Sequence, residues 1–257
     1  MTTPKHEHHP APPTAADPWA ALRVHTPARI ALGRSGASLP TRELLAFGIA
    51  HAQARDAVHA ALDVAALRAD LAGFGLPVIE VCSAAPNRAA YLARPDWGRR
   101  LDPVSAAALA RPAAAPDVVF VIADGLSAVA AQRHAAPLLA ISLPMLGDLV
   151  IGPLVIASQA RVALADAVAM ALGARLVVSL IGERPGLSAP DSLGAYLTHA
   201  PQPGTTDAER NCLSNIRPEG LGYAAAAAEL AALIRRARAA GISGIGLSAA
   251  TALAAAG

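Results

Sequence analysis

The residues best suited to chemistry stand in two short patches, LIGERPGLSAPDS at 180–192 and TDAERNCLSNIRP at 206–218. In the first patch, Glu183 and Arg184 follow an apolar run and precede a Pro-Gly pair that favours a turn. The Glu183 carboxylate could accept hydrogen bonds from a polar ligand such as an amide donor. The alternative is an exposed Glu–Arg pair of little energetic value. The pattern of this loop alone slightly favours the exposed Glu–Arg pair.

Cys212 stands in the second patch, among short hydrogen-bonding side chains in the run NCLSN. Its thiol could be a nucleophile, a ligand contact or a small buried hydrophobe. No second cysteine lies at metal-binding spacing, so the sequence predicts no metal site. A Cys–His nucleophile would need a distant base such as His51, His134 or His199.

Asp124 is a third candidate, because it directly follows the apolar run DVVFVIA and precedes Gly-Leu-Ser. A carboxylate at that position either faces a ligand or caps the next helix, and the sequence favours capping. Neither GxGxxG after a strand nor GxxxxGK[ST] occurs, which argues against a dinucleotide fingerprint and a P-loop. No GxSxG indicates a hydrolase elbow.

The elements that must position these residues alternate between β-rich runs and Ala-rich helical patterns. Strands are predicted over Leu76–Ser83, Asp117–Ala123, Pro137–Leu143 and Leu176–Ile181, and helices over Arg161–Leu172 and Tyr223–Ala240. Between the first two strands, Pro86–Pro116 is expected to form helix fragments and loops. This alternation predicts an α/β fold, with a mostly parallel, Rossmann-like sheet flanked by helices. Ligands of such folds bind at the carboxyl ends of the strands.

Three regions are expected along the chain. Residues 1–16 are rich in Pro, His and Thr and are predicted to be a disordered tail, in which a mobile His cluster lacks the geometry of a metal site. Residues 17–75 should form a small helical region with one long helix from Thr41 to about Ala72. The α/β domain should occupy residues 76–257.

Composition excludes several classes of protein. Only 16% of the 257 residues are charged and the net charge is +2, so a nucleic-acid partner is not expected. The longest apolar stretch, 135–158, is interrupted by prolines and an aspartate, which argues against a membrane span. Two cysteines indicate a reducing, cytoplasmic setting. A hydrophobic fraction of 54% with few charges is typical of a chain that buries a large protein interface.

Several patches together resemble the small (light) subunit of ethanolamine ammonia-lyase. The resemblance covers about Asp17 to Leu247 and is most specific in GERPGLS and NCLSNIRP; it is carried by RIALGRSGASLPT, AHAQARDAV, ADGLSA, LIGERPGLSAPDSLGAYLT and TDAERNCLSNIRP.

The resemblance implies a lyase subunit that uses adenosylcobalamin to convert ethanolamine to acetaldehyde and ammonia. It implies a large-subunit partner that binds ethanolamine, with the cofactor between the two chains. Val162 in QARVALAD, Glu183 and Cys212 carry over as cofactor-binding residues, and no catalytic residue is expected in this chain. The resemblance also implies a cytoplasmic enzyme, housed in a bacterial microcompartment.

The sequence lacks the D-x-H-x-x-G motif by which some cobalamin proteins replace the lower base of the cofactor, so base-on binding is expected. Two other functions stay open at this point. The chain could be an assembly module without cofactor function, or a thiol hydrolase that uses Cys212.

Overall fold

The computed structural model describes residues 17, 19–26 and 28–249, so the tail predicted for residues 1–16 lies outside the described part. The chain divides into two compact units, Met1–Gln53 and Ala54–Gly257. The first unit contains the short 3-10 helix η1 (Ala20–His25) and the greater part of helix α1 (Thr41–His59). Within it, the Glu43 carboxylate pairs with Arg42 at 3.0 Å.

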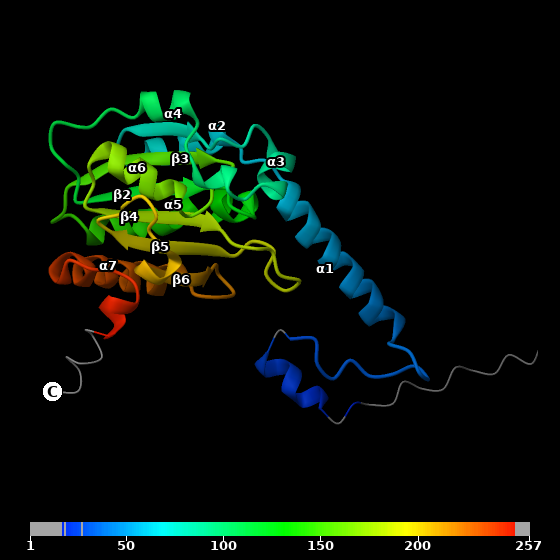
Figure 1. Ribbon diagram of the computed structural model, residues 1–257. Helices are drawn as coiled ribbons and strands as arrows, with labels where there is room; N and C mark the ends of the chain where they lie inside the picture. Colours follow the sequence, from blue (N-terminus) through cyan, green and yellow to red (C-terminus); the bar gives the residue numbers. More distant parts are fainter. Residues whose placement is uncertain (1–16, 18, 27, 250–257) are drawn as a thin grey trace, which may run out of the picture. The chain divides into compact units, whose positions relative to one another are not determined.

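The second unit is built on a six-stranded sheet, shown in Figure 1. The strands are β1 (Val78–Cys82), β2 (Val118–Ala123), β3 (Ile151–Ser158), β4 (Leu176–Gly182), β5 (Leu193–His199) and β6 (Arg210–Ile216). Their spatial order is β1-β3-β2-β4-β5-β6. The first four strands in that order are parallel, whereas β5 pairs antiparallel with both β4 and β6. The predicted α/β class with a mostly parallel sheet is therefore confirmed.

Helices cover both faces of this sheet, and the alternation of side chains along a strand divides the core between them. In β2, Val118, Phe120 and Ile122 belong to one apolar cluster, and the intervening residues belong to the other. The first cluster is completed by α2 (Val64–Ala72), α5 (Ala128–Met145) and α7 (Tyr223–Ala240), and the second by α6 (Leu164–Leu172). All six residues of β2 are buried, which explains its continuous apolar sequence.

Most predicted elements are confirmed. The three strands at 76–83, 117–123 and 176–181 correspond to β1, β2 and β4. The predicted late helix is α7, which ends at Gly241 with a left-handed φ of 68°. The Pro- and Arg-rich region contains only short pieces, α3 (Arg88–Ala93), η2 (Trp97–Arg99) and α4 (Pro103–Ala108), as expected.

The strand predicted over Pro137–Leu143 is wrong, because these residues lie inside α5. A short apolar run fits a buried strand and a buried helix equally well. The segment is helical because Ala130, Ala131, Leu138 and Leu139 of α5 pack together into the first apolar cluster. The helix forms although α5 contains two prolines. The strand of this region is instead β3, which begins after the turn at 146–150.

The single helix predicted from Thr41 to Ala72 is also wrong, because the chain breaks into α1 and α2. Asp63 begins the second helix as its N-cap, with its carboxylate accepting a hydrogen bond from the Ala66 N–H at 3.0 Å. A capping side chain of this kind favours a new helix start over continuation. Leu67 and Leu71 of α2 are then buried against the sheet.

The end of β4 lies exceptionally close to the turn that follows β2. A Cβ atom at Gly182 would stand 2.0 Å from the Ser127 carbonyl oxygen and 2.7 Å from that of Asp124. A Cβ at Gly125 would stand 2.2 Å from the Gly182 carbonyl oxygen. These two glycines therefore permit the backbone contact that joins the ends of neighbouring strands.

Replacing Gly182 by alanine should lower the free energy of unfolding by about 3 kcal/mol, because the backbone atoms in its way cannot rotate aside. Gly48→Ala is the matched control. Apart from its chain neighbours and the backbone of its own helix, no described atom lies within 4 Å of the added Cβ, and alanine in α1 should raise stability by ~0.5–1 kcal/mol. Urea denaturation of the full chain measures both. Equal effects of the two substitutions would contradict the close contact.

Candidate functional site

A cavity of about 380 Å³ lies at the carboxyl edge of the parallel strands. It lies among α3, the turn after β2, the turn before α6, the end of β4 and one residue of β5. The lining residues are Tyr91, Gly125, Leu126, Arg161, Val162, Ile181, Gly182, Glu183, Arg184 and Tyr196. Two of the three residues predicted for the site, Val162 and Glu183, thus line one cavity although they come from different loops.

The turn that carries Val162 is held by Asp124, which is only 2% exposed. Its carboxylate accepts hydrogen bonds from the backbone N–H groups of Gln159 and Ala160, both at 2.9 Å, and from Arg88 Nη1 at 3.3 Å. Burial raises the pKa of Asp124, and these donors oppose the rise. Asp124 is not the helix cap that the sequence favoured: Ser127 caps α5 by accepting from the Ala130 N–H at 3.3 Å.

Glu183 is oriented by two hydrogen bonds to the same carboxylate oxygen. Its Oε2 accepts from the Ser192 hydroxyl and from the Asn215 backbone N–H, the latter at 3.2 Å. Its own N–H donates to the Ser192 carbonyl at 2.9 Å. A carboxylate can accept about four hydrogen bonds, so Glu183 keeps accepting capacity for a ligand while its geometry is fixed. The idle Glu–Arg pair considered from the sequence is not formed among the described residues.

Cys212 does not line this cavity, but it is the cross-strand partner of Tyr196, which does. The Cys212 residue is solvent-accessible, yet desolvation by the surrounding atoms raises the pKa of its thiol. The Tyr196 hydroxyl lowers this pKa, and the nearby Glu183 charge raises it further. The thiol is consequently protonated near neutral pH, which does not favour a nucleophile.

None of the three candidate histidines contacts Cys212 in the described part of the chain. His134 lies on α5, where its Nδ1 stands 2.7 Å from the Tyr223 hydroxyl. Burial lowers the pKa of His134 and of His199. A Cys–His pair therefore has no support in the geometry.

Sequence reasoning missed an arginine–tyrosine stack beside the cavity. The guanidinium of Arg161 lies 4.4 Å from the centre of the Tyr91 ring, and that of Arg88 lies 4.8 Å from it. The Tyr91 hydroxyl donates to the Ala160 carbonyl at 3.0 Å, and burial raises the pKa of Tyr91 to about 12. No local motif marks these residues, since Tyr91 and Arg161 are distant in sequence and meet only in the fold.

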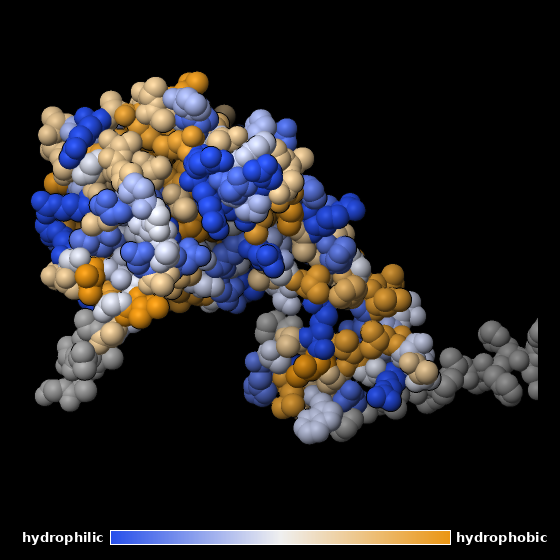
Figure 2. Space-filling view, in the orientation of Figure 1, coloured by the Kyte–Doolittle hydropathy of each residue, from blue (hydrophilic) through white to orange (hydrophobic). Residues whose placement is uncertain are grey.

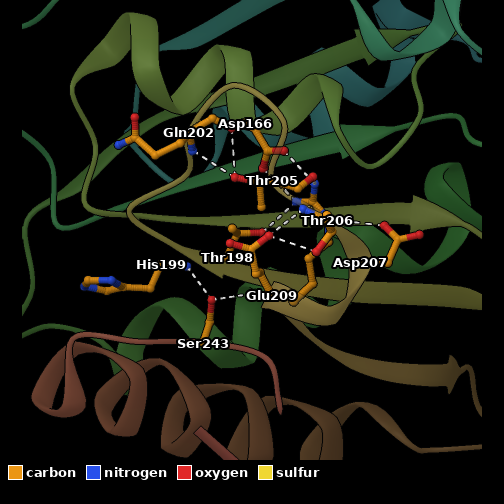
Figure 3. Close-up of polar contacts among 10 residues, drawn as sticks. Asp166, Thr198, His199, Gln202, Thr205, Thr206, Asp207, Glu209 and Ser243 are labelled. Atoms are coloured by element: carbon orange, nitrogen blue, oxygen red, sulfur yellow. Dashed lines mark hydrogen bonds and ion pairs between the residues drawn. The ribbon is translucent and has the colours of Figure 1, made fainter. Parts of the chain in front are cut away.

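A larger cavity of about 710 Å³ shares Arg161 and Val162 with the first. One of its walls is the loop 202–207, of which Figure 3 shows Gln202, Thr205, Thr206 and Asp207. Arg210, at the start of β6, holds this loop through the Thr205 carbonyl. Arg210 binds both carboxylate oxygens of Asp166 at 2.7 and 2.6 Å, the Thr198 hydroxyl at 2.8 Å and the Thr205 carbonyl at 3.0 Å. Arg210 is only 7% exposed and its ion pair with Asp166 is bidentate, so this contact fixes α6 against β5 and β6.

A six-stranded, mostly parallel sheet with helices on both faces and a cavity at the carboxyl edge defines a Rossmann-like α/β protein. The family model for the ethanolamine ammonia-lyase light chain (EutC) matches residues 16–248. The chain therefore belongs to the family of ethanolamine ammonia-lyase small subunits, and it is a subunit of a carbon–nitrogen lyase.

Curated relatives agree over most of their length. The small subunit from Ralstonia nicotianae is 58% identical over 227 residues, which cover 86% of this chain and 84% of the relative. The Bradyrhizobium diazoefficiens small subunit is 57% identical over 230 residues, covering 88% of each chain. The Azotobacter vinelandii small subunit is 54% identical over 241 residues, covering 91% of this chain and 89% of the relative. The designation as a small subunit implies a large-subunit partner.

Alkylation of Cys212 by iodoacetamide should be slow at pH 7 and should accelerate above pH 9, because the reactive thiolate forms only above the raised pKa. A Cys82→Ser background leaves Cys212 as the one thiol of the chain. Tyr196→Phe removes the hydroxyl that lowers this pKa, so the rate profile should move to still higher pH. A thiol that reacts at its full rate by pH 7 would contradict this environment.

Proposed function

We propose that this chain forms one wall of the adenosylcobalamin site of ethanolamine ammonia-lyase, at the boundary with the large subunit. The observation that carries the proposal is the cavity at the carboxyl edge, which both Val162 and Glu183 line. Cys212 lies on β6 opposite Tyr196, another lining residue. Val162, Glu183 and Cys212 are the residues that the family resemblance assigns to the cofactor.

The chemistry of these side chains fits the edge of a corrin, which carries neutral amide groups. Glu183 can accept hydrogen bonds from amide N–H groups, and Ser192 and Asn215 hold its carboxylate in place. Val162 is half-buried and packs against the second apolar cluster, so it offers an apolar contact of fixed position. Cys212 contributes a small, neutral thiol.

In this proposal the cofactor supplies the reaction chemistry, and the three residues of this chain bind and position the cofactor. Adenosylcobalamin, when bound, supplies radical chemistry through homolysis of its cobalt–carbon bond. None of the three residues needs to transfer a proton; their task is to orient the cofactor and exclude water from it. Base-on binding and an ethanolamine site formed by the large subunit complete the proposal.

We also propose that the enzyme acts in the cytoplasm, within a bacterial microcompartment. No helix in the described residues is long and apolar enough to span a membrane.

A surface for the large subunit is suggested by the N-terminal unit, over which hydrophobic residues gather in Figure 2. Apolar side chains on α1 are unusually exposed: Leu45 by 62% and Ile49 by 61%, with Leu44 and Phe47 also open. An isolated protein rarely leaves so many large apolar side chains together on one helix. We therefore propose that this unit docks onto the large subunit.

The basic test is ammonia release from ethanolamine, measured with each chain alone and with both chains together, each with adenosylcobalamin. Only the assembled complex should be active. If both chains fold but form no cobalamin-dependent, ammonia-releasing complex, the proposed function fails.

Replacing Glu183 by glutamine should raise the dissociation constant of adenosylcobalamin for the complex roughly ten- to hundredfold, since charge-assisted hydrogen bonds are lost. Turnover at saturating cofactor should stay near the native value, because Glu183 moves no proton. Glu229→Gln on α7, where Glu229 pairs with Arg236, is the matched control. An unchanged affinity, or a turnover that saturating cofactor fails to restore, would count against the assigned role.

Substituting Leu45 and Ile49 together by aspartate should weaken association with the large subunit by at least about tenfold, because two charges would have to be desolvated at the interface. Val104→Asp serves as the control, since Val104 is 79% exposed but lies on α4 of the other unit. Sedimentation equilibrium of the mixed chains measures the effect. Association as tight as in the native pair would remove α1 from the interface.

A further inference from the structure

Among the described residues, Arg161 is the one arginine that lines both the 380 Å³ cavity and the 710 Å³ cavity. It directly precedes Val162, and the family resemblance gives Arg161 itself no role. Its backbone N–H donates to the Gly98 carbonyl at 2.8 Å, and its guanidinium stacks on Tyr91. A Cβ on Gly98 would come within 3.0 Å of the Arg161 Cγ, so glycine there leaves room for the side chain.

In the described part of the chain, no carboxylate forms an ion pair with Arg161, so its charge is not neutralised there. The buried Nε of Arg161 has no hydrogen-bond partner among the same residues. Arg88, which also lies over the Tyr91 ring, is bound to Asp124 and to the carbonyls of Val58 and Gly125. Arg88 thus has a structural role, whereas the Arg161 guanidinium faces the cavities without an ion-pair partner among the described residues.

The other arginines of the two cavities are less suited to bind a ligand. Arg210 is occupied by Asp166, Thr198 and Thr205. Arg99 and Arg184 are exposed and would lose rotamer freedom on binding. The larger cavity is lined by three arginines against two aspartates, which leaves one positive charge in excess. An anionic group therefore fits where the two cavities meet at Arg161.

We infer that Arg161 binds the phosphodiester of the nucleotide tail of cobalamin, while Glu183 binds the amide edge of the corrin. This inference rests on the proposed function. The phosphodiester is the ionised group among the peripheral substituents of cobalamin, and a guanidinium is the side chain whose fork matches phosphate oxygens. Stacking on Tyr91 holds that fork in place before the ligand arrives, which lowers the entropic cost of binding. Arg161 is in these terms a binding residue and takes no part in the reaction.

The test measures binding of three ligands to the complex of both subunits by absorbance titration: cyanocobalamin, cyanocobinamide phosphate and cyanocobinamide. The last two share the absence of a lower base and differ in the phosphate. Arg161→Met keeps the apolar stem on Tyr91 and removes the charge. It should weaken binding of the two phosphate-bearing ligands roughly ten- to hundredfold and leave cyanocobinamide within about twofold.

Controls separate this inference from the function on which it rests. Arg236→Met removes one positive charge on α7 and should change none of the three affinities. Glu183→Gln should weaken all three ligands alike, because all carry corrin amides. If Glu183→Gln and Arg161→Met both leave every affinity unchanged, the proposed cofactor site fails.

The inference about Arg161 alone is overturned by either of two results. In one, Arg161→Met weakens the three ligands equally, which would indicate a general role in shaping the cavity. In the other, Arg184→Met produces the phosphate-dependent loss and Arg161→Met does not. Arg161→Lys should retain part of the affinity for the phosphate-bearing ligands, since an ammonium keeps the charge without the fork.

Discussion

The buried carboxylate of Asp124 is the contact on which the geometry of the cavity depends. An ionised carboxylate in the protein interior is costly unless it is paired and hydrogen-bonded. Here the backbone of residues 159–160 and the Arg88 guanidinium meet that requirement together. One side chain at the end of β2 thereby joins the turn after β3 to α3, and Arg88 extends the connection to the Tyr91 ring and so to Arg161. Displacing any of these segments would leave a buried charge without partners.

The two kinds of strand pairing contribute different parts of the cavity. The parallel strands end at one edge and deliver turns, which carry the half-buried Val162 and the oriented Glu183. The antiparallel β5–β6 pair delivers side chains from within strands, as the Tyr196–Cys212 partners illustrate. The resulting wall combines apolar and polar side chains, and the described residues place no thiolate at neutral pH and no Cys–His pair there. Such a wall suits a lyase subunit that positions a ligand and leaves reaction chemistry to its partner.

The parts of the fold that were predicted from sequence are those whose pattern has one physical solution. Continuous β-branched runs bounded by turn residues produced β2 and β4, and an Ala-rich amphipathic pattern closed by glycine produced α7. Prediction failed where local patterns are degenerate. The run 137–143 is apolar in either conformation, and only its packing against the sheet makes it helical. The edge strand β6 was not predicted because its sequence, RNCLSNI, neither alternates between apolar and polar residues nor forms a continuous apolar run.

For the site, the sequence by itself determined the α/β class, the family and the residue types at Val162, Glu183 and Cys212, because these are properties of contiguous motifs. Only the tertiary structure decided how they are used. It showed that Asp124 does not cap a helix but holds the turn after β3, since the N–H groups that it binds lie 35 and 36 residues away in the sequence. It also set Arg161 on Tyr91 between two cavities. Such contacts depend on strand order and loop closure, which bring distant residues together and leave no mark in any short stretch of sequence.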